Sequence, residues 1–207
     1  MNIIRILLVE DHFLARTALI SIVSRREEMQ VVAIAENGSD AIAQYFQHHP
    51  DVTVMDMRLP GVSGLEAIRA IRNGDPGARI LVLTNFDGSE DIYRALRAGA
   101  SGYLVKDTSR AELLNAIHAT YKGTRYIPEN LRNRLAERSN GSDLTPRELE
   151  VLALLTHGGS NRDISHQLKI AEKTTSIHVS NILSKLGVVD RTQAAIAAIQ
   201  RGLVHLD

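Results

Sequence analysis

The chain has 207 residues, of which 44% are hydrophobic and 23% are charged, an ordinary composition for a globular protein of two modest domains. Its 24 Lys and Arg residues balance its 24 Asp and Glu residues, so any surface that attracts nucleic acid must be local. The absence of cysteine excludes disulfides, thiolate zinc sites and cysteine catalysis, and no apolar run approaches a membrane span, so we expect a cytoplasmic protein.

Over the first 120 residues, short apolar segments rich in β-branched residues alternate with longer segments of helical spacing. The short segments predict strands that are buried on both faces, at 3–9, 31–35, 52–55, 80–83 and 102–105. Ser63 with Glu66, and Ser109 with Glu112, have the spacing of capping boxes at helix starts. Five strand–helix repeats predict an α/β doubly wound, five-stranded parallel sheet with helices on both faces.

Polar residues follow the predicted strands at their carboxyl ends. Glu10 and Asp11 follow the first strand, Asp56 the third, Thr84 the fourth and Lys106 the fifth. In an open parallel sheet these ends line one crevice, so we expect the five side chains to converge there. Each residue alone is open to a structural explanation, such as a helix cap, and it is their joint placement that favours a functional site.

The donors at this crevice indicate phosphoryl chemistry. Crowded carboxylates repel one another unless a cation lies among them, and a donor set of oxygens alone suits Mg²⁺. A carboxylate beside Mg²⁺ can attack a phosphoryl group and become an acyl phosphate, which makes Asp56 the candidate nucleophile. Lys106 and the Thr84 hydroxyl would then contact the phosphoryl oxygens.

From about residue 121 only helix signals remain. The segment 122–142 has one helical patch and leads into a polar Ser-Asn-Gly-Ser-Asp stretch at 139–143, which we interpret as a linker. The remainder, 143–207, predicts a small all-α domain of four helices. We therefore expect an α/β domain over 1–121, a linker over 122–142 and the helical domain over 143–207.

Helix boundaries within the last domain are marked by caps. Thr145 begins the first helix, with proline next in the chain and a glutamate at the capping-box position, and Ser160 begins a short second helix. The third helix is expected over 172–186, ending at Gly187, and the fourth over 192–200.

The third helix has two distinct faces. Thr175, Val179, Ile182 and Leu186 form a stripe expected to be buried. The opposite face carries Lys173, Thr174, Ile177, Ser180, Asn181 and Ser184. Such hydroxyls and amides can contact phosphates and base edges, and an isoleucine can contact a thymine methyl. This helix alone favours the other interpretation, a solvated face with one exposed apolar residue.

The strand-end residues also carry a family resemblance. VEDH, VTVMDMRLPGVSGLE, ILVLT and GASGYLVKD resemble the receiver domain of two-component response regulators over about residues 3–120. The resemblance implies the following roles: Asp56 as phosphoacceptor, Glu10, Asp11, Asp56 and the Arg58 backbone carbonyl as Mg²⁺ ligands, Thr84 and Lys106 as phosphate contacts, and Tyr103 as a switch aromatic. Arg58 and Phe86 flank the site and are expected to set the dephosphorylation rate.

The segment LTPRELEVLALLTHGGSNRDISHQLKIAEKTTSIHVSNILSKLGV is similar to the helix-turn-helix output domain of the LuxR/NarL class, over about 143–205. Together the two resemblances imply a NarL/FixJ-type response regulator that docks its third helix in the major groove. The DNA-binding residues are then Lys173, Thr174, Ser176, Ile177, Ser180, Asn181 and Lys185, and the last helix dimerises through Arg191, Ala195 and Ile199.

Three residues depart from this class. Ala171 stands where a serine usually caps the third helix, Thr175 replaces a usual valine, and Ser176 replaces a lysine that commonly reaches DNA. Residues 143–207 carry seven Lys and Arg against seven Asp and Glu, a net charge of zero. We therefore expect weak binding by a monomer, a shallow salt dependence, and reliance on a homodimer.

The resulting prediction is a transcriptional regulator, not an enzyme, that binds double-stranded DNA after a sensor histidine kinase phosphorylates Asp56. Three alternatives stay open: a regulator that binds DNA without phosphorylation, a Mg²⁺-dependent phosphoryl hydrolase, and an output domain that binds a protein. Arg58 speaks against the hydrolase, because phosphatases with a strand-end aspartate carry a second acid at that position.

Overall fold

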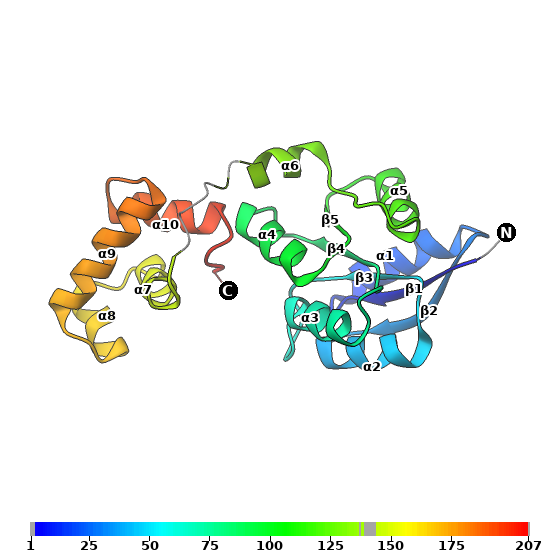
Figure 1. Cartoon of the computed structure of the whole chain (residues 1–207), viewed down its shortest axis with the longest axis horizontal. Coiled ribbons are helices and arrows are strands. Elements are labelled where there is room, and N and C mark those ends of the chain that lie inside the picture. The colour runs from blue at the N-terminus through cyan, green and yellow to red at the C-terminus, as the bar shows by residue number, and fades with distance from the viewer. Residues whose placement is uncertain (1–2, 137, 139–143, 207) are drawn as a thin grey trace. The chain divides into compact units, whose positions relative to one another are not determined.

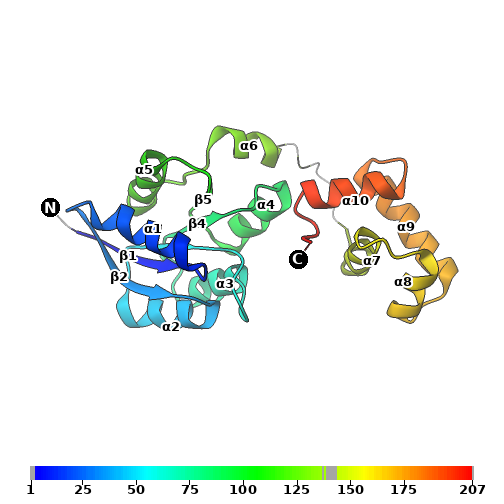
Figure 2. The ribbon, with the colours of Figure 1, turned by 180° about the vertical axis from the view of Figure 1, so that it is seen from behind.

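The structure, a computed structural model, describes residues 3–136, 138 and 144–206, so the predicted 139–143 linker lies outside the described residues. The chain forms two compact units, shown from opposite sides in Figures 1 and 2. One unit comprises residues 1–86 and 92–132, and the other comprises 133–207 together with the short segment 87–91. A helix, α6 (Glu129–Ala136), occupies the helical patch of the predicted linker.

The first unit contains a parallel sheet, as predicted. Its described strands are β1 (Ile4–Val9), β2 (Met29–Ala35), β3 (Val52–Met55), β4 (Ile80–Thr84) and β5 (Gly102–Val105). Their spatial order is β2-β1-β3-β4-β5, and every neighbouring pair is parallel. The winding direction reverses between β1 and β3, and the carboxyl ends of these two strands therefore flank the switch point at which open α/β sheets place their sites.

The prediction that every strand is buried on both faces is wrong for β2. This strand lies at the sheet edge, its Gln30 is exposed, and Ile34 retains 41% of its accessible surface. The internal strands β3 and β4 are buried at every residue, because neighbouring strands and helices cover them on all sides. β5 is also an edge strand, but residue 126 pairs with Gly102 and covers part of it.

In the described part of the chain, five helices flank the sheet: α1 (Phe13–Ser24), α2 (Gly38–His48), α3 (Gly64–Gly74), α4 (Ser89–Ala98) and α5 (Arg110–Tyr121). Side chains alternate along a strand, so Ile6 and Leu8 enter a core cluster with Leu19 of α1 and Ile117 of α5. The intervening Leu7 is buried on the opposite face, where α2 and α3 lie side by side (Figures 1 and 2).

The two predicted capping boxes of this unit have different outcomes. At α3 both bonds form: the amide of Glu66 donates to Ser63 Oγ (3.3 Å), and the amide of Ser63 donates to Glu66 Oε2 (2.9 Å). At α5 the amide of Glu112 donates to Ser109 Oγ (3.1 Å), but the reciprocal bond is replaced. The Glu112 carboxylate accepts from Thr108 Oγ1 (2.8 Å) instead, so the full box predicted there is wrong.

The second unit contains the four predicted helices: α7 (Pro146–Thr156), α8 (Asn161–Leu168), α9 (Glu172–Leu186) and α10 (Arg191–Gln200). Thr145 and Ser160 cap α7 and α8 with complete capping boxes, and Gly187 ends α9 in the left-handed conformation. Their apolar faces enclose one core of nine buried residues: Val151, Leu152, Leu155, Ile164, Ile182, Leu186, Ala194, Ala198 and Val204. Among the described helices, none is long and apolar enough to cross a membrane.

Candidate functional site

Three carboxylates meet at the carboxyl ends of β1 and β3. Glu10 and Asp56 are almost completely buried and Asp11 is exposed, and each offers one oxygen within 4.8 Å of the other two. The sheet ladder continues one residue past each strand: the amide of Glu10 donates to Ala35 O (3.0 Å), and that of Asp56 to Val9 O (3.0 Å). Rigid backbone therefore holds the two buried carboxylates, as the strand-end prediction requires.

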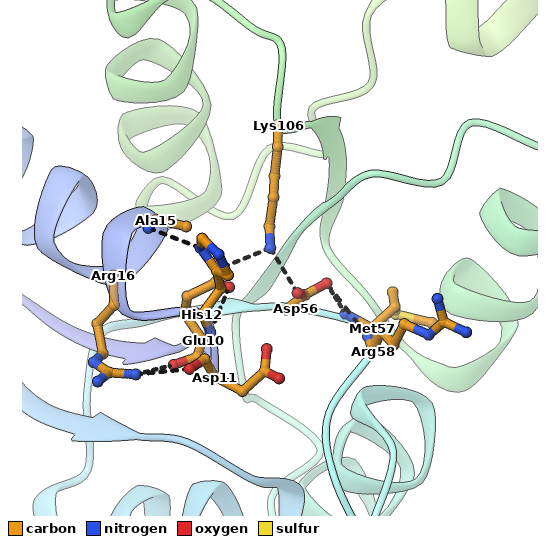
Figure 3. Close-up of polar contacts among 9 residues, drawn as sticks. All are labelled: Glu10, Asp11, His12, Ala15, Arg16, Asp56, Met57, Arg58 and Lys106. Carbon is orange, nitrogen blue, oxygen red and sulfur yellow. Dashed lines mark hydrogen bonds and ion pairs between the residues drawn. The ribbon is translucent and has the colours of Figure 1, made fainter. Parts of the chain in front are cut away.

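Lys106 lies between the two buried carboxylates (Figure 3). Its Nζ is 2.7 Å from Glu10 Oε2 and 2.7 Å from Asp56 Oδ2. Burial lowers the pKa of Lys106, but the hydrogen bonds and charges of Asp56 and Glu10 outweigh burial and leave the pKa above its ordinary value. The side chain is therefore an ammonium at neutral pH, and it offsets part of the repulsion between the carboxylates.

Backbone amides orient both buried carboxylates. Asp56 Oδ1 accepts from the amides of Met57 (2.6 Å) and Arg58 (3.3 Å), and Glu10 Oε1 accepts from the amide of His12 (3.1 Å) (Figure 3). Bonds to a charged group of this kind are shorter and stronger than those between neutral groups, so they fix the orientation of the two carboxylates. Asp56 thus faces an ammonium with one oxygen and amide donors with the other.

Thr84 and Tyr103 are completely buried on the neighbouring strands β4 and β5. In the described part of the chain, the Thr84 hydroxyl has no hydrogen-bond partner. The Tyr103 hydroxyl donates to the backbone oxygen of Phe86 (2.9 Å), two residues after Thr84. The Arg58 guanidinium lies over the Phe86 ring, 5.8 Å from its centroid, so the two flanking residues contact each other.

The donor set fits a magnesium ion. Glu10, Asp11 and Asp56 supply oxygen alone, the donor that hard divalent cations prefer, and three carboxylates exceed the single charge of Lys106. The Arg58 amide donates to Asp56, which places the Arg58 backbone beside the site. The role of the Arg58 carbonyl as a further ligand stays a prediction.

Two residues of this site escaped prediction. Gly64 lies so close to Asp56 that a Cβ atom on it would be 2.0 Å from the Asp56 carbonyl oxygen, which requires glycine at that position. Arg16 donates to the backbone oxygens of Glu10 and Asp11. Arg16 is the sole charged residue of the segment that forms α1, and this was the feature of the sequence that could have indicated a specific role for it.

In the helical unit, α9 has the two predicted faces. Thr175, Ile182 and Leu186 are buried, and Val179 packs against the core from a half-buried position. All six residues of the opposite face are exposed: Lys173, Thr174, Ile177, Ser180, Asn181 and Ser184. This face offers hydroxyls, an amide, one ammonium and an isoleucine that is 53% exposed.

Two of the predicted DNA-binding residues already have partners within the unit. Ser176 is exposed, donates to Glu172 O (3.1 Å) and accepts from Asn161 Nδ2 (3.1 Å), which links α8 to α9. Lys185 Nζ lies 2.7 Å from Oε2 of the buried Glu148, which links α9 to α7. The DNA-binding role of each therefore stays a prediction alongside a structural role.

The last helix, α10, begins at Arg191, one residue before the predicted start, because Asp190 accepts from the amide of Gln193 (2.8 Å) and caps it. Ile199 is 42% exposed and Ala195 is half-buried, while Arg191 donates to the backbone oxygen of Gly159. The predicted dimerisation residues thus include an outward apolar side chain, and the neighbouring Ile196, 50% exposed, extends that surface.

Comparison with known proteins gives two family matches. A family model described as a response regulator receiver domain matches residues 6–118, and one described as bacterial regulatory proteins of the luxR family matches residues 142–198. The response regulator protein VraR of Staphylococcus epidermidis is 38% identical over 207 residues, covering 98% of this chain and 99% of VraR. The transcriptional regulatory protein LnrK of Bacillus subtilis is 38% identical over 216 residues, covering 97% and 98%.

Solved structures are similar to nearly the whole chain. The response regulator ChrA of a heme-sensing two-component system is 38% identical, with a TM-score of 0.59, and covers 98% of this chain and 100% of its own. RcsB of Salmonella enterica serovar Typhimurium, solved bound to a promoter with the phosphomimetic BeF₃⁻, is 25% identical, with a TM-score of 0.73, and covers 97% and 100%.

Proposed function

Because the chain belongs to the two-component response regulators that join a receiver domain to a LuxR-type DNA-binding domain, we propose that phosphorylation of Asp56 controls its binding to DNA. The chain is a DNA-binding transcriptional regulator, and its partners are double-stranded DNA and a sensor histidine kinase. The proposal adds three points: the residues that act, the Mg²⁺ ion, and phosphorylation as the step that precedes DNA binding. It also includes a cytoplasmic location, where both partners are accessible.

One observation carries the proposal: Glu10, Asp11 and Asp56 offer oxygens within 4.8 Å of one another. In the transfer step a carboxylate oxygen of Asp56 attacks the phosphorus of a phosphohistidine on the kinase. The new O–P bond forms as the P–N bond breaks, and the histidine nitrogen keeps the electron pair. A Mg²⁺ ion held by these carboxylates and the Arg58 carbonyl would supply charge neutralisation for the phosphoryl oxygens.

The chain's own residues then hold the acyl phosphate. Lys106 is an ammonium beside Asp56, so it can exchange its bond to the carboxylate for one to a phosphoryl oxygen. The buried Thr84 hydroxyl gains a hydrogen-bond partner when it bonds a second phosphoryl oxygen. Because Tyr103 is bonded to Phe86, two residues after Thr84, a shift of Thr84 would be transmitted to Tyr103.

The output of the proposed switch is DNA binding as a homodimer. We assign the α9 face and its neighbours to the major groove: Lys173, Thr174, Ser176, Ile177, Ser180, Asn181 and Lys185. We assign the pairing of two copies to α10, through Arg191, Ala195 and Ile199, and the exposed isoleucines of that helix support this assignment. The related RcsB has been solved bound to a promoter in the presence of a phosphomimetic, which supports the link between phosphorylation and DNA binding.

The alternatives have less support. A phosphoryl hydrolase needs a general acid near the acyl phosphate, but Arg58 occupies the position two residues past Asp56 and its guanidinium stacks on Phe86. A regulator that acts without phosphorylation would have no need for three carboxylates that converge around Lys106. We therefore infer a switch with slow self-hydrolysis, without enzymatic turnover.

The test is the intact mass of the protein after incubation with acetyl phosphate and Mg²⁺. We compare the wild type with Asp56→Asn and with Asp107→Asn, a matched control at an exposed aspartate one residue past Lys106. One phosphoryl adduct on the wild type and the control, and none on Asp56→Asn, is the expected result. An adduct of equal yield on Asp56→Asn, or none on any protein, would overturn the proposal. Sedimentation of the phosphorylated wild type should show a shift toward a dimer.

A further inference from the structure

Arg16 of α1 contacts the backbone of both metal-binding residues of the first loop. Its Nη1 donates to the carbonyl oxygens of Glu10 (3.0 Å) and Asp11 (3.1 Å), as Figure 3 shows. The side chain is only 14% exposed, and the guanidinium also lies 5.9 Å from the centroid of the Phe13 ring. A nearly buried arginine thus satisfies two carbonyl groups at the point where the sheet ladder ends.

The same guanidinium also faces a second loop, in an ion pair whose carboxylate side chain is 62% exposed and is therefore largely screened by solvent. Arg16 Nη2 lies 3.1 Å from Oε1 of Glu36, which directly follows β2. Arginine presents several N–H donors in a rigid planar fork, so one side chain can join the loops after β1 and β2 at once. Lysine, with a single flexible ammonium, cannot reproduce all three contacts.

Asp11 is the carboxylate that depends most on this arrangement. Glu10 and Asp56 are each held by Lys106 and by backbone amides. Among the described residues, no side chain or amide bonds the Asp11 carboxylate, which is exposed. The direction of its Cα–Cβ bond is therefore set by the two peptide planes on either side of it, and Arg16 fixes the carbonyls of both planes.

We propose that Arg16 is a positioning residue for Mg²⁺, acting through the carbonyls of Glu10 and Asp11 to aim the Asp11 carboxylate at the site. This inference rests on the metal site of the proposed function. Charge alone predicts the opposite effect, because removal of a guanidinium near carboxylates would strengthen the binding of a cation. The sign of the change in Mg²⁺ affinity therefore separates positioning from simple electrostatics.

The test is a MgCl₂ titration of the full-length ¹⁵N-labelled protein, followed by the amide shifts of residues 10–12 and 56–58. Arg16→Gln should weaken Mg²⁺ binding about tenfold, the usual effect of losing a group that orients a metal ligand. Arg16→Lys should recover part of the loss, to about threefold, because its ammonium can still bond one of the two carbonyl oxygens. Arg5→Gln is the matched control, since Arg5 donates to the backbone oxygen of His49 (2.9 Å) near the opposite end of the sheet.

Wild-type or tighter Mg²⁺ affinity in Arg16→Gln would overturn the inference. If Arg16→Gln does not fold, Arg16→Lys decides, and wild-type affinity in that variant is the contradicting result. An equal loss in Arg5→Gln would also overturn it, because the effect would then reflect general destabilisation. Failure of the proposed function has a different signature: the wild type itself would neither bind Mg²⁺ nor gain a phosphoryl adduct.

Discussion

Lys106 and Asp56 form an ion pair of 2.7 Å, and the same ammonium is 2.7 Å from Glu10. Lys106 therefore lies between the two buried carboxylates and offsets part of their charge. It is 17% exposed, so little water screens these contacts. A divalent cation bound by the same carboxylates would be repelled by this ammonium, which makes Lys106 a competitor of Mg²⁺ as well as a phosphate ligand.

Lys106→Met should therefore have opposite effects on stability and on metal affinity. Without metal, Glu10 and Asp56 lose their counter-ion, and the free energy of unfolding should fall by about 2–3 kcal/mol. Mg²⁺ should bind about fivefold more tightly, because a repulsion of about 1 kcal/mol is removed. Thermal melts in EDTA and in MgCl₂ measure both effects, with the exposed Lys122→Met as control. A variant with unchanged Mg²⁺ affinity would contradict the competition.

Thr84→Val should separate signalling from stability. The Thr84 hydroxyl is buried without a partner in the described structure, so its removal should leave stability unchanged or raise it by up to about 1 kcal/mol. The acyl phosphate would lose one hydrogen bond, and dimerisation on phosphorylation should weaken. Thr53→Val is the matched control: that hydroxyl is equally buried and unpartnered, but it lies within β3. Sedimentation with acetyl phosphate measures the response, and an equal loss in both variants would refute a specific role for Thr84.

Much of the receiver site could be predicted because the parallel sheet dictates it. Once Asp56 and Lys106 are assigned to strand ends, the geometry of the sheet brings them to one edge, and no side-chain detail is needed. Helix starts were equally accessible, since Thr145 and Ser160 form local bonds with the next turn. The pattern at Ser109 was misleading because a second nearby residue, Thr108, donates a hydrogen bond to the Glu112 carboxylate.

Contacts to backbone oxygens, and contacts between distant segments, were not predictable from residue patterns. Arg16 donates to backbone oxygens, which every residue type carries. The residue types in the sequence therefore do not predict this contact. Lys185 is a basic residue on the recognition helix, but its partner Glu148 lies 37 residues earlier and is buried as part of a capping box. The edge position of β2 likewise depends on strand order, which strand patterns alone do not specify.

Ala171→Ser should stabilise the start of the recognition helix. Ala171 has the extended backbone of an N-cap, but its side chain makes no cap hydrogen bond to the first turn of α9. A serine should accept a hydrogen bond there and raise the free energy of unfolding by about 1 kcal/mol. Ser160→Ala, which removes the working cap of α8, should lower it by a similar amount, about 1 kcal/mol. Urea denaturation followed by the NMR signals of α8 and α9 gives both values, and no gain in Ala171→Ser would contradict this account.

The ion pair of Glu148 and Lys185 should make the helical domain sensitive to acid. Burial raises the pKa of Glu148, but the Lys185 ammonium and the amide and hydroxyl of Thr145 outweigh burial and hold it below its ordinary value of 4.5. A carboxyl whose pKa is lower in the folded state stabilises fully above its unfolded pKa, and the stabilisation disappears as pH falls through the folded pKa. The free energy of unfolding of α7–α10 should therefore fall as the pH drops below about 4.5.

Glu148→Gln should flatten that acid dependence and destabilise the domain by about 1–2 kcal/mol at neutral pH, because Lys185 loses its charged partner and the capping box weakens. Glu150→Gln is the matched control. The Glu150 side chain pairs with Arg147 but is 53% exposed, and solvent screens such a pair almost completely. The measurement is urea denaturation between pH 3 and pH 7, followed by the NMR signals of α7 and α9. An acid dependence in Glu148→Gln equal to that of the wild type would assign the pH sensitivity to other carboxylates.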